Sequence, residues 1–277
     1  MKELIKSRIE ALLSKEFYCD LKELNEKATI YSVNTNTKQS YIKILIYRNC
    51  IVVCTSESLQ SKISEILQGK NRDEIFELPF VYGQTIHYVP DGDILSDVKC
   101  PSVPAGASNT GCPKGDTLSD SMCYPAGYQY ESLFNKEIFS LVGLTGFENS
   151  LAFDETGFTS TKAVCLAKDN ERIIGVAGAA ESSIDGVWEV GIDVLEEYRN
   201  AGLGTYLVRK LTEELLKRNV VPFYSASVTN IGSQMVASRC GYIPFWVDTF
   251  GTIFDGSSAY NALFRKGLAD PDFLNDK

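Results

Sequence analysis

The sequence is poor in the residues that most metal and redox sites need. His87 is its only histidine, and none of its 8 cysteines belongs to a C-x-x-C pair. Because zinc sites are usually built from clustered cysteine and histidine ligands, no metal is expected. Cys100, Cys112 and Cys123 leave a metal or redox cluster open as an alternative, although their spacing matches no familiar template.

Positive charge and long apolar runs are also scarce. The 27 lysines and arginines are outnumbered by 36 acidic residues, which gives a net charge of −9. Phosphate backbones are bound by concentrated basic faces, so nucleic acid is not an expected partner. The first residues mix both charges without an apolar core, which predicts neither a signal peptide nor a membrane span. We therefore expect a cytoplasmic protein with reduced cysteines and no membrane partner.

The length of 277 residues allows two domains. Residues 1–90 have the pattern of a small α/β domain of unknown role. Residues 91–128 are rich in proline, glycine and serine and predict a linker or an ordered loop. The N-terminal helices are expected at 1–17 and 56–68, and the strands at 28–33, 41–47, 50–54 and 80–89.

Residues 129–277 predict a second domain built around one strand. Helices are expected at 131–141, 145–151, 203–216 and 231–240, and strands at 163–167, 172–180, 188–194, 222–228, 242–250 and within 258–264. Asn230 is placed to cap the last helix and Gly241 to end it.

The stretch 187–204 contains the strongest motif. Residues 188–194 alternate as a half-buried strand, and an R-x-x-G-x-G turn follows at Arg199, Gly202 and Gly204 before an amphipathic helix. The first amides of a helix have no partner within it, and the helix dipole adds partial positive charge, so this turn can hold a phosphate. An ordinary strand-to-helix turn is the alternative reading.

This order of strand, glycine turn, helix, second strand, Asn230 and Gly241-Tyr242 resembles the acyl-coenzyme A site of the GNAT acetyltransferase superfamily. The turn lacks the Gly-Lys-Ser/Thr ending of a P-loop, and its first glycine does not directly follow the strand as in dinucleotide-binding folds. The resemblance covers about half of the chain. It implies an α+β fold with a mixed, mostly antiparallel twisted sheet flanked by helices, after a smaller α/β domain.

The resemblance also implies the cosubstrate, acetyl-coenzyme A, and the residues that bind it. The turn amides would hold the pyrophosphate, and the preceding strand would bond the pantetheine arm and the thioester carbonyl. The residues implied are Ile192, Val194, Arg199, Asn200, Ala201, Gly202, Leu203, Gly204, Thr205 and Asn230.

Acyl transfer to an amine requires the neutral amine, whereas a lysine-like ammonium has a pKa of about 10.4. Glu189 is the first candidate for the base or ammonium holder, and Asp193 lies on the same face of the strand. Many family members protonate the leaving thiolate with a tyrosine where this chain has Ala237. Tyr242 or Tyr224 is the substitute candidate, and a core aromatic is the alternative reading of each.

The sequence thus predicts transfer of an acetyl group from acetyl-coenzyme A to a primary amine by direct attack. The alternatives are a coenzyme A sensor without transfer activity and a structural protein with an empty turn. The expected acceptor is a small-molecule or peptide amine, and a homodimer is left open. No pattern identifies the acceptor or the role of residues 1–128.

Overall fold

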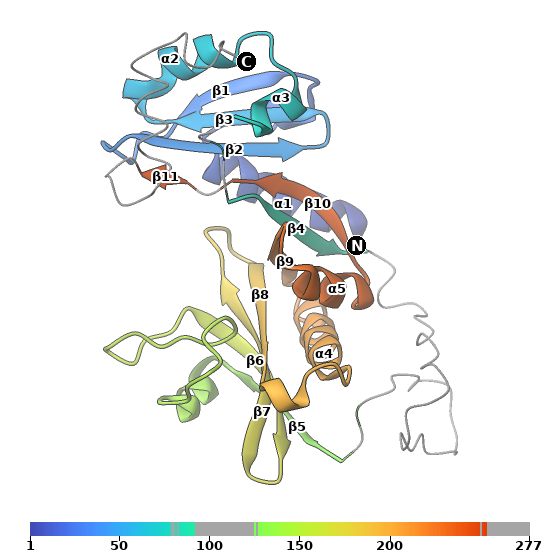
Figure 1. The fold of residues 1–277 in the computed structure, drawn as a ribbon. Coiled ribbons are helices and arrows are strands. Elements are labelled where there is room, and N and C mark those ends of the chain that lie inside the picture. The colour runs from blue at the N-terminus through green and yellow to red at the C-terminus, as the bar shows by residue number, and fades with distance from the viewer. Residues whose placement is uncertain (79–80, 82, 92–124, 126, 250, 254–277) are drawn as a thin grey trace. The chain divides into compact units, whose positions relative to one another are not determined.

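The computed structural model describes residues 1–78, 81, 83–91, 125, 127–249 and 251–253 (Figure 1). Within them the chain forms two compact units, each assembled from separate stretches. The first unit takes Met1–Arg8, Tyr88–Ser225 and Asn230–Ile243, and the second takes Ile9–His87, Ala226–Thr229 and Pro244–Lys277. This division differs from the predicted domains 1–90 and 129–277, because the C-terminal strand supplies residues to the N-terminal sheet.

The first unit contains the stretch with the glycine turn. Its elements are β5 (Gln129–Phe134), η2 (Asn135–Leu141), β6 (Thr161–Asp169), β7 (Arg172–Glu181), β8 (Val187–Val194), η3 (Glu196–Tyr198), α4 (Leu203–Lys217), most of β9 (Val221–Ser227) and α5 (Ile231–Arg239). Its strands lie in the order β9-β8-β7-β6-β5, with only the β8–β9 pair parallel. This is the mixed, mostly antiparallel sheet that the sequence predicts.

Helix α4 covers one face of this sheet, and the segment that contains η2 covers the other (Figure 1). The leucines of α4 are buried, as its four-residue apolar spacing predicts. A Cβ at Gly175 on β7 would lie 3.0 Å from Leu207 Cδ1, so this glycine allows the helix to approach the sheet closely. The opposite face packs Phe147, Leu151 and Ile138 against Val164 and Val176.

The second unit contains a further set of strands and helices. Its elements are most of α1 (Lys2–Glu16), η1 (Glu23–Asn25), β1 (Thr29–Val33), β2 (Tyr41–Tyr47), β3 (Cys50–Thr55), α2 (Glu57–Leu67), α3 (Arg72–Phe76), β11 (Thr252–Ile253), and parts of β4 (Thr85–Pro90) and β10 (Tyr242–Asp248). Strand β2 forms an antiparallel hairpin with β3, and β1 pairs with β3 in parallel. Strand β10 joins through Val247 opposite Ile46 of β2.

Helices α2 and α3 cover one face of β1, β2 and β3 (Figure 1). Ile63 and Ile75 pack on Ile44 and Val53. From α1, the carboxylate of Glu10 accepts a hydrogen bond from the hydroxyl of Tyr47 on β2 at 3.0 Å. The fold class predicted from the sequence, α+β with an N-terminal sheet region before the GNAT-like part, is confirmed.

Three predicted elements differ from the structure. The helix expected at 131–141 is strand β5 followed by the 3-10 helix η2, because residues 129–134 pair along the open edge of β6. No helix forms at 145–151, where the chain instead makes turns across the sheet. The strand expected at 80–89 begins at Thr85. The strand expected within 258–264 lies outside the described residues.

The cysteines of the described residues are free thiols. Cys19, Cys50, Cys54, Cys165 and Cys240 are all buried. No cluster of histidine, cysteine and carboxylate side chains in the described stretches has the makings of a metal site. Cys100, Cys112 and Cys123 lie outside them. No described helix has the length and hydropathy needed to cross a membrane.

Candidate functional site

The site begins where β8 loses one of its neighbours. Strand β8 pairs with β7 along its whole length, but its pairing with β9 ends at Val190 opposite Tyr224. Main-chain groups alternate between the two sides of a strand, and the amide of Leu195 bonds to β7, so those of Ile192 and Val194 point toward β9. The amides of Ile192 and Val194 therefore point, without a partner strand, into the space where the strands separate.

The glycine turn lies between the end of β8 and the first turn of α4. Gly202 is the N-cap residue of α4 with φ +82°, and Asn200 also has a positive φ of +63°. Glycine adopts this backbone conformation without steric cost. Within the described residues, no group of the chain accepts a hydrogen bond from the amides of residues 200–205. Six consecutive free amides at a helix N-terminus form a site for an anion.

The first residues of α4 are held against β8. A Cβ built at Gly204 would lie 3.5 Å from Ile192 Cγ1 and 3.6 Å from Val194 Cγ2. The structure therefore brings the predicted binding residues of the turn next to those of the strand. A molecule with a phosphate on the turn would have its extended part beside the free edge of β8.

Arg199 closes this turn. Its amide donates to the carbonyl of Glu196 at 3.2 Å, and its Nε donates to the carbonyl of Val194 at 2.8 Å. The amide, which the resemblance offered to phosphate, is thus already engaged within the chain. In this conformation Arg199 holds the strand end to the turn, and its side chain remains exposed.

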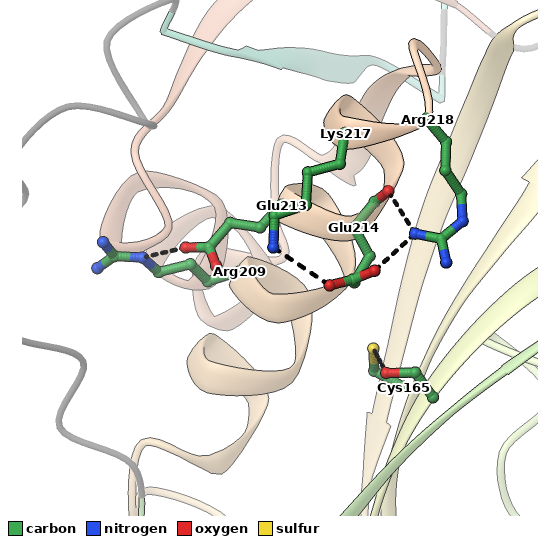
Figure 2. A network of polar contacts seen from close by, with 7 residues as sticks. Cys165, Arg209, Glu213, Glu214, Lys217 and Arg218 are labelled. Carbon is green, nitrogen blue, oxygen red and sulfur yellow. Dashed lines mark hydrogen bonds and ion pairs between the residues drawn. The ribbon is translucent and has the colours of Figure 1, made fainter. Parts of the chain in front are cut away.

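Charged side chains of α4 are neutralised within the helix. Figure 2 shows Arg209 paired with Glu213 at 3.4 Å, while Lys217 and Arg218 bind Glu214 at 3.3 and 2.6 Å. The bond from Arg218 is the main reason why the pKa of Glu214 is lowered. These pairs leave the main-chain amides, the helix dipole and the Arg199 guanidinium as sources of positive charge at the turn.

The two candidate carboxylates lie on one face of β8. This face is opposite α4, because Ile192 and Val194 on the other face lie next to Gly204 of the helix. Glu189 is exposed, and no hydrogen bond or ion pair of its carboxylate occurs among the described residues. The Asp193 carboxylate instead accepts three hydrogen bonds, from Asn149 Nδ2 at 2.7 Å and from Ser150 N and Oγ at 2.8 and 2.9 Å. Of the two, only the Glu189 carboxylate has no hydrogen-bond partner among the described residues.

The third candidate, Tyr242, lies in the core. Its side chain is 3% exposed and its hydroxyl bonds to Thr212 Oγ1 at 2.7 Å, while burial raises the pKa of the phenol. The structure does not bring this hydroxyl to the open end of β8. Tyr224 is also buried, and its hydroxyl lies 2.8 Å from Ser233 Oγ on α5. Burial raises its pKa as well.

Helix α5 begins at the predicted cap. Asn230 Oδ1 accepts a hydrogen bond from the amide of Ser233 at 3.0 Å, which confirms the cap. Its other predicted role, toward a pantetheine arm, remains a prediction. Ala237 is fully buried, and the buried Cys240 thiol donates to the carbonyl of Thr205, which links α5 to α4. Burial raises the pKa of Cys240 to about 12, so this thiol is no nucleophile at neutral pH.

The sequence analysis did not identify Asn149 and Ser150 as site residues. Both belong to a turn that the sequence analysis read as a helix, and their contacts with Asp193 span more than forty residues. Gly191 on β8 and Gly178 on β7 were a sequence signal for this contact. An isolated glycine in a strand often marks the close approach of another backbone, and here the carbonyls of Asn149 and Ser150 lie against these two glycines.

The chain was compared with known proteins. Residues 130–242 match the family model described as Acetyltransferase (GNAT) family. The search of curated proteins gave no match.

Several solved structures are similar at low identity. A GNAT-family acetyltransferase from Novosphingobium aromaticivorans is 16% identical over 60% of this chain and 63% of its own, with TM-score 0.39. A GCN5-related N-acetyltransferase-like protein from Streptococcus suis is 15% identical over 90% and 99%, with TM-score 0.44. A GCN5-related N-acetyltransferase from Kribbella flavida is 18% identical over 60% and 56%, with TM-score 0.38. The chain thus spans less than two thirds of the Novosphingobium and Kribbella proteins.

The matched residues run from β5 to the start of β10 and include the separating strands, the turn and both helices around it. Residues 130–242 of this chain are therefore similar to the GNAT acetyltransferase family.

Proposed function

We propose that the chain transfers an acetyl group from acetyl-coenzyme A to a primary amine. The observation that carries this proposal is the run of free amides at residues 200–205 beside the amides of Ile192 and Val194, which have no partner strand. The free amides can donate hydrogen bonds to the diphosphate of coenzyme A. The strand edge can pair with the amides of the pantetheine arm, as it would with a further strand.

The reaction needs few side chains. The neutral amine nitrogen attacks the thioester carbonyl and the carbon–sulfur bond breaks. The proton that the nitrogen loses as it becomes an amide passes to the departing sulfur, directly or through water, so coenzyme A leaves as its thiol. The Ile192 or Val194 amide is placed to donate to the developing oxyanion. Glu189 takes the ammonium proton directly or through water. The acceptor class proposed is a small-molecule or peptide amine, since the exposed carboxylate favours a cationic group.

The test is calorimetry with acetyl-coenzyme A, followed by thiol release with a panel of primary amines. We expect binding at one site per chain and amine-dependent release. Absence of binding by protein that unfolds cooperatively would contradict both the site and the function.

A second candidate function is a coenzyme A sensor that has lost transfer. It is favoured by buried Ala237 at the position of the family tyrosine and by the engaged hydroxyls of Tyr224 and Tyr242. A sensor would bind acetyl-coenzyme A yet release no thiol above background with any amine. Thiol release therefore decides between the two functions.

A further inference from the structure

A short segment crosses the face of the first unit's sheet opposite α4. It runs from Phe147 to Leu151, both 3% exposed, and contains the turn of Asn149 and Ser150. A Cβ built at Gly191 on β8 would lie 1.9 Å from the carbonyl oxygen of Asn149. At Gly178 on β7 it would lie 1.7 Å from that of Ser150. The segment thus rests directly on two strands at the points where both lack side chains.

The Asp193 carboxylate fastens this segment. Its Oδ1 accepts from Asn149 Nδ2 at 2.7 Å, and its Oδ2 accepts from the amide and hydroxyl of Ser150 at 2.8 and 2.9 Å. Hydrogen bonds to an ionised acceptor are about twice as strong as neutral ones. Three of them between strand and crossing segment leave Asp193 little free lone-pair capacity for a substrate proton.

Glu189 lies on the same face, two residues before Gly191, with its carboxylate free. A rise of about 3.3 Å per residue places its Cα roughly 7 Å from the point where the segment crosses β8. The crossing segment therefore forms a wall next to the candidate base. The position of this wall matters for catalysis, because a misplacement of the reacting groups by about 1 Å can lower the rate about a hundredfold.

We propose that Asp193 is a positioning residue, which holds the segment 147–151 across β8 and β7 as a wall of the acceptor site beside Glu189. The proposal rests on the proposed acetyl transfer. Asp193 itself neither takes a proton nor touches the cosubstrate. The acceptor amine approaches Glu189 along this wall, so loosening the wall weakens amine binding without changing the proton transfer.

The test removes the contact from each side in turn. Asp193→Asn removes acceptor capacity from the strand, and the double change Asn149→Ala with Ser150→Ala removes the side-chain donors while the carboxylate stays. The matched control is Asp154→Asn, whose carboxylate also accepts three bonds, from Thr156 N and Oγ1 and from Phe158 N, but only within its own exposed loop.

Two readouts are compared. Hydrogen exchange at the amide of residue 150, taken relative to its intrinsic rate, should accelerate at least about tenfold in Asp193→Asn and in the double variant, but not in the control. The amine that gives the fastest thiol release from acetyl-coenzyme A serves as acceptor probe. The KM for this amine should rise at least about tenfold in Asp193→Asn and in the double variant. The affinity for acetyl-coenzyme A and the pH profile of kcat should stay unchanged.

Opposite results overturn the proposal. If Asp193→Asn lowers kcat and removes the acid limb of its pH profile while the double variant is normal, Asp193 is a base. If the hydrogen-exchange rate of the Ser150 amide is unchanged in Asp193→Asn, Asp193 does not hold the segment 147–151 in place. If the wild type acetylates no amine, the proposed function fails and the positioning role fails with it. The exchange measurement needs no amine. It therefore tests whether Asp193 holds the segment even if the proposed acetyl transfer fails.

Discussion

At the scale of single residues, the site depends on where side chains are absent. Gly202 has φ +82°, and an added Cβ would meet nothing within 4 Å. A glutamate there places bulk and negative charge beside the free amides. We expect Gly202→Glu to abolish acetyl-coenzyme A binding in calorimetry and to cost about 1–2 kcal/mol of stability from backbone strain.

The matched control for this variant is Gly143→Glu, because Gly143 has φ +89° and equally open surroundings. It should lose a similar amount of stability and bind the cosubstrate normally. Equal affinity of the Gly202 variant and the wild type would place the phosphate elsewhere.

Glu189 makes the second prediction at this scale. Removing a general base typically lowers the rate 100- to 10,000-fold, so Glu189→Gln should lower kcat/KM by at least about a hundredfold with unchanged acetyl-coenzyme A affinity. Glu181→Gln, at an exposed position at the end of β7, is the control. A loss confined to KM would make Glu189 an ammonium holder rather than the base.

Residue patterns predicted the turn and strand part of the site well. The alternation of 188–194 and the spacing of Gly202 and Gly204 are local signals, and the structure has the strand and the helix where they indicate. The environment of Tyr242 and the donors around Asp193 could not be read in this way. They depend on Thr212 and on Ser150, which meet them only through the tertiary fold.

At the scale of elements, three strands of the second unit meet at one buried carboxylate. Asp248 of β10 lies 2.8 Å from His87 Nε2 of β4 and 3.2 Å from Lys43 Nζ of β2. The ring of Trp246 stacks on His87 at 4.4 Å. Burial opposes ionisation of Asp248, but the bond and charge from His87 together with Lys43 outweigh it, and the pKa of the carboxyl is lowered.

A lowered folded pKa gives this carboxylate a defined effect on stability. Its contribution is fully present above the unfolded pKa of about 3.9 and is lost as the pH falls through the folded value. Asp248→Asn should therefore lower the free energy of unfolding by about 1–3 kcal/mol at pH 7, and the difference from the wild type should vanish in acid. Urea unfolding from pH 7 down to pH 3 measures this. Asp73→Asn, at an exposed ion pair, should show almost no difference at any pH.

Helices and strands were predicted correctly where the apolar residues follow a single helical or strand repeat. Strands β2, β3 and β8 and helices α2, α4 and α5 lie at the expected places. Strand β5 was missed because its sequence, QYESLF, has no clean alternation and forms a strand only through pairing with β6. The turn at 145–151 was misread because its contacts with β7 and β8 lie far along the chain.

At the scale of the whole molecule, neither unit is a continuous piece of sequence. The first unit uses Met1–Arg8, where Ile5 is buried and Arg8 donates to the carbonyls of Gly186 and Asn219. A truncated chain of residues 129–277 lacks these contacts. We expect it to aggregate or to lack near-ultraviolet circular dichroism, although it contains the entire matched region.

The full-length variant Arg8→Ala is the companion measurement. It removes only the side-chain bonds and should fold with a modestly lower unfolding temperature. A truncated chain that unfolds cooperatively and binds acetyl-coenzyme A as tightly as the full chain would contradict the assignment of residues 1–8 to the first unit.

Local sequence patterns do not determine which segments form one compact unit. The composition changes after residue 90, where proline, glycine and serine become frequent. Strand pairing, however, determines which residues form one compact unit. The partnership of β10 with β2 joins segments about two hundred residues apart, and no local pattern encodes such a pairing.

The long sequence separation between β2 and β10 has a consequence during synthesis. At about 5–20 residues per second, the ribosome needs roughly 10–40 seconds after making Ile46 before it releases Val247, its partner. Until then the growing chain exposes an unsatisfied strand edge. Nascent protein should therefore depend on chaperones that shield such edges, and translation arrested before Tyr242 should yield chains that proteases degrade.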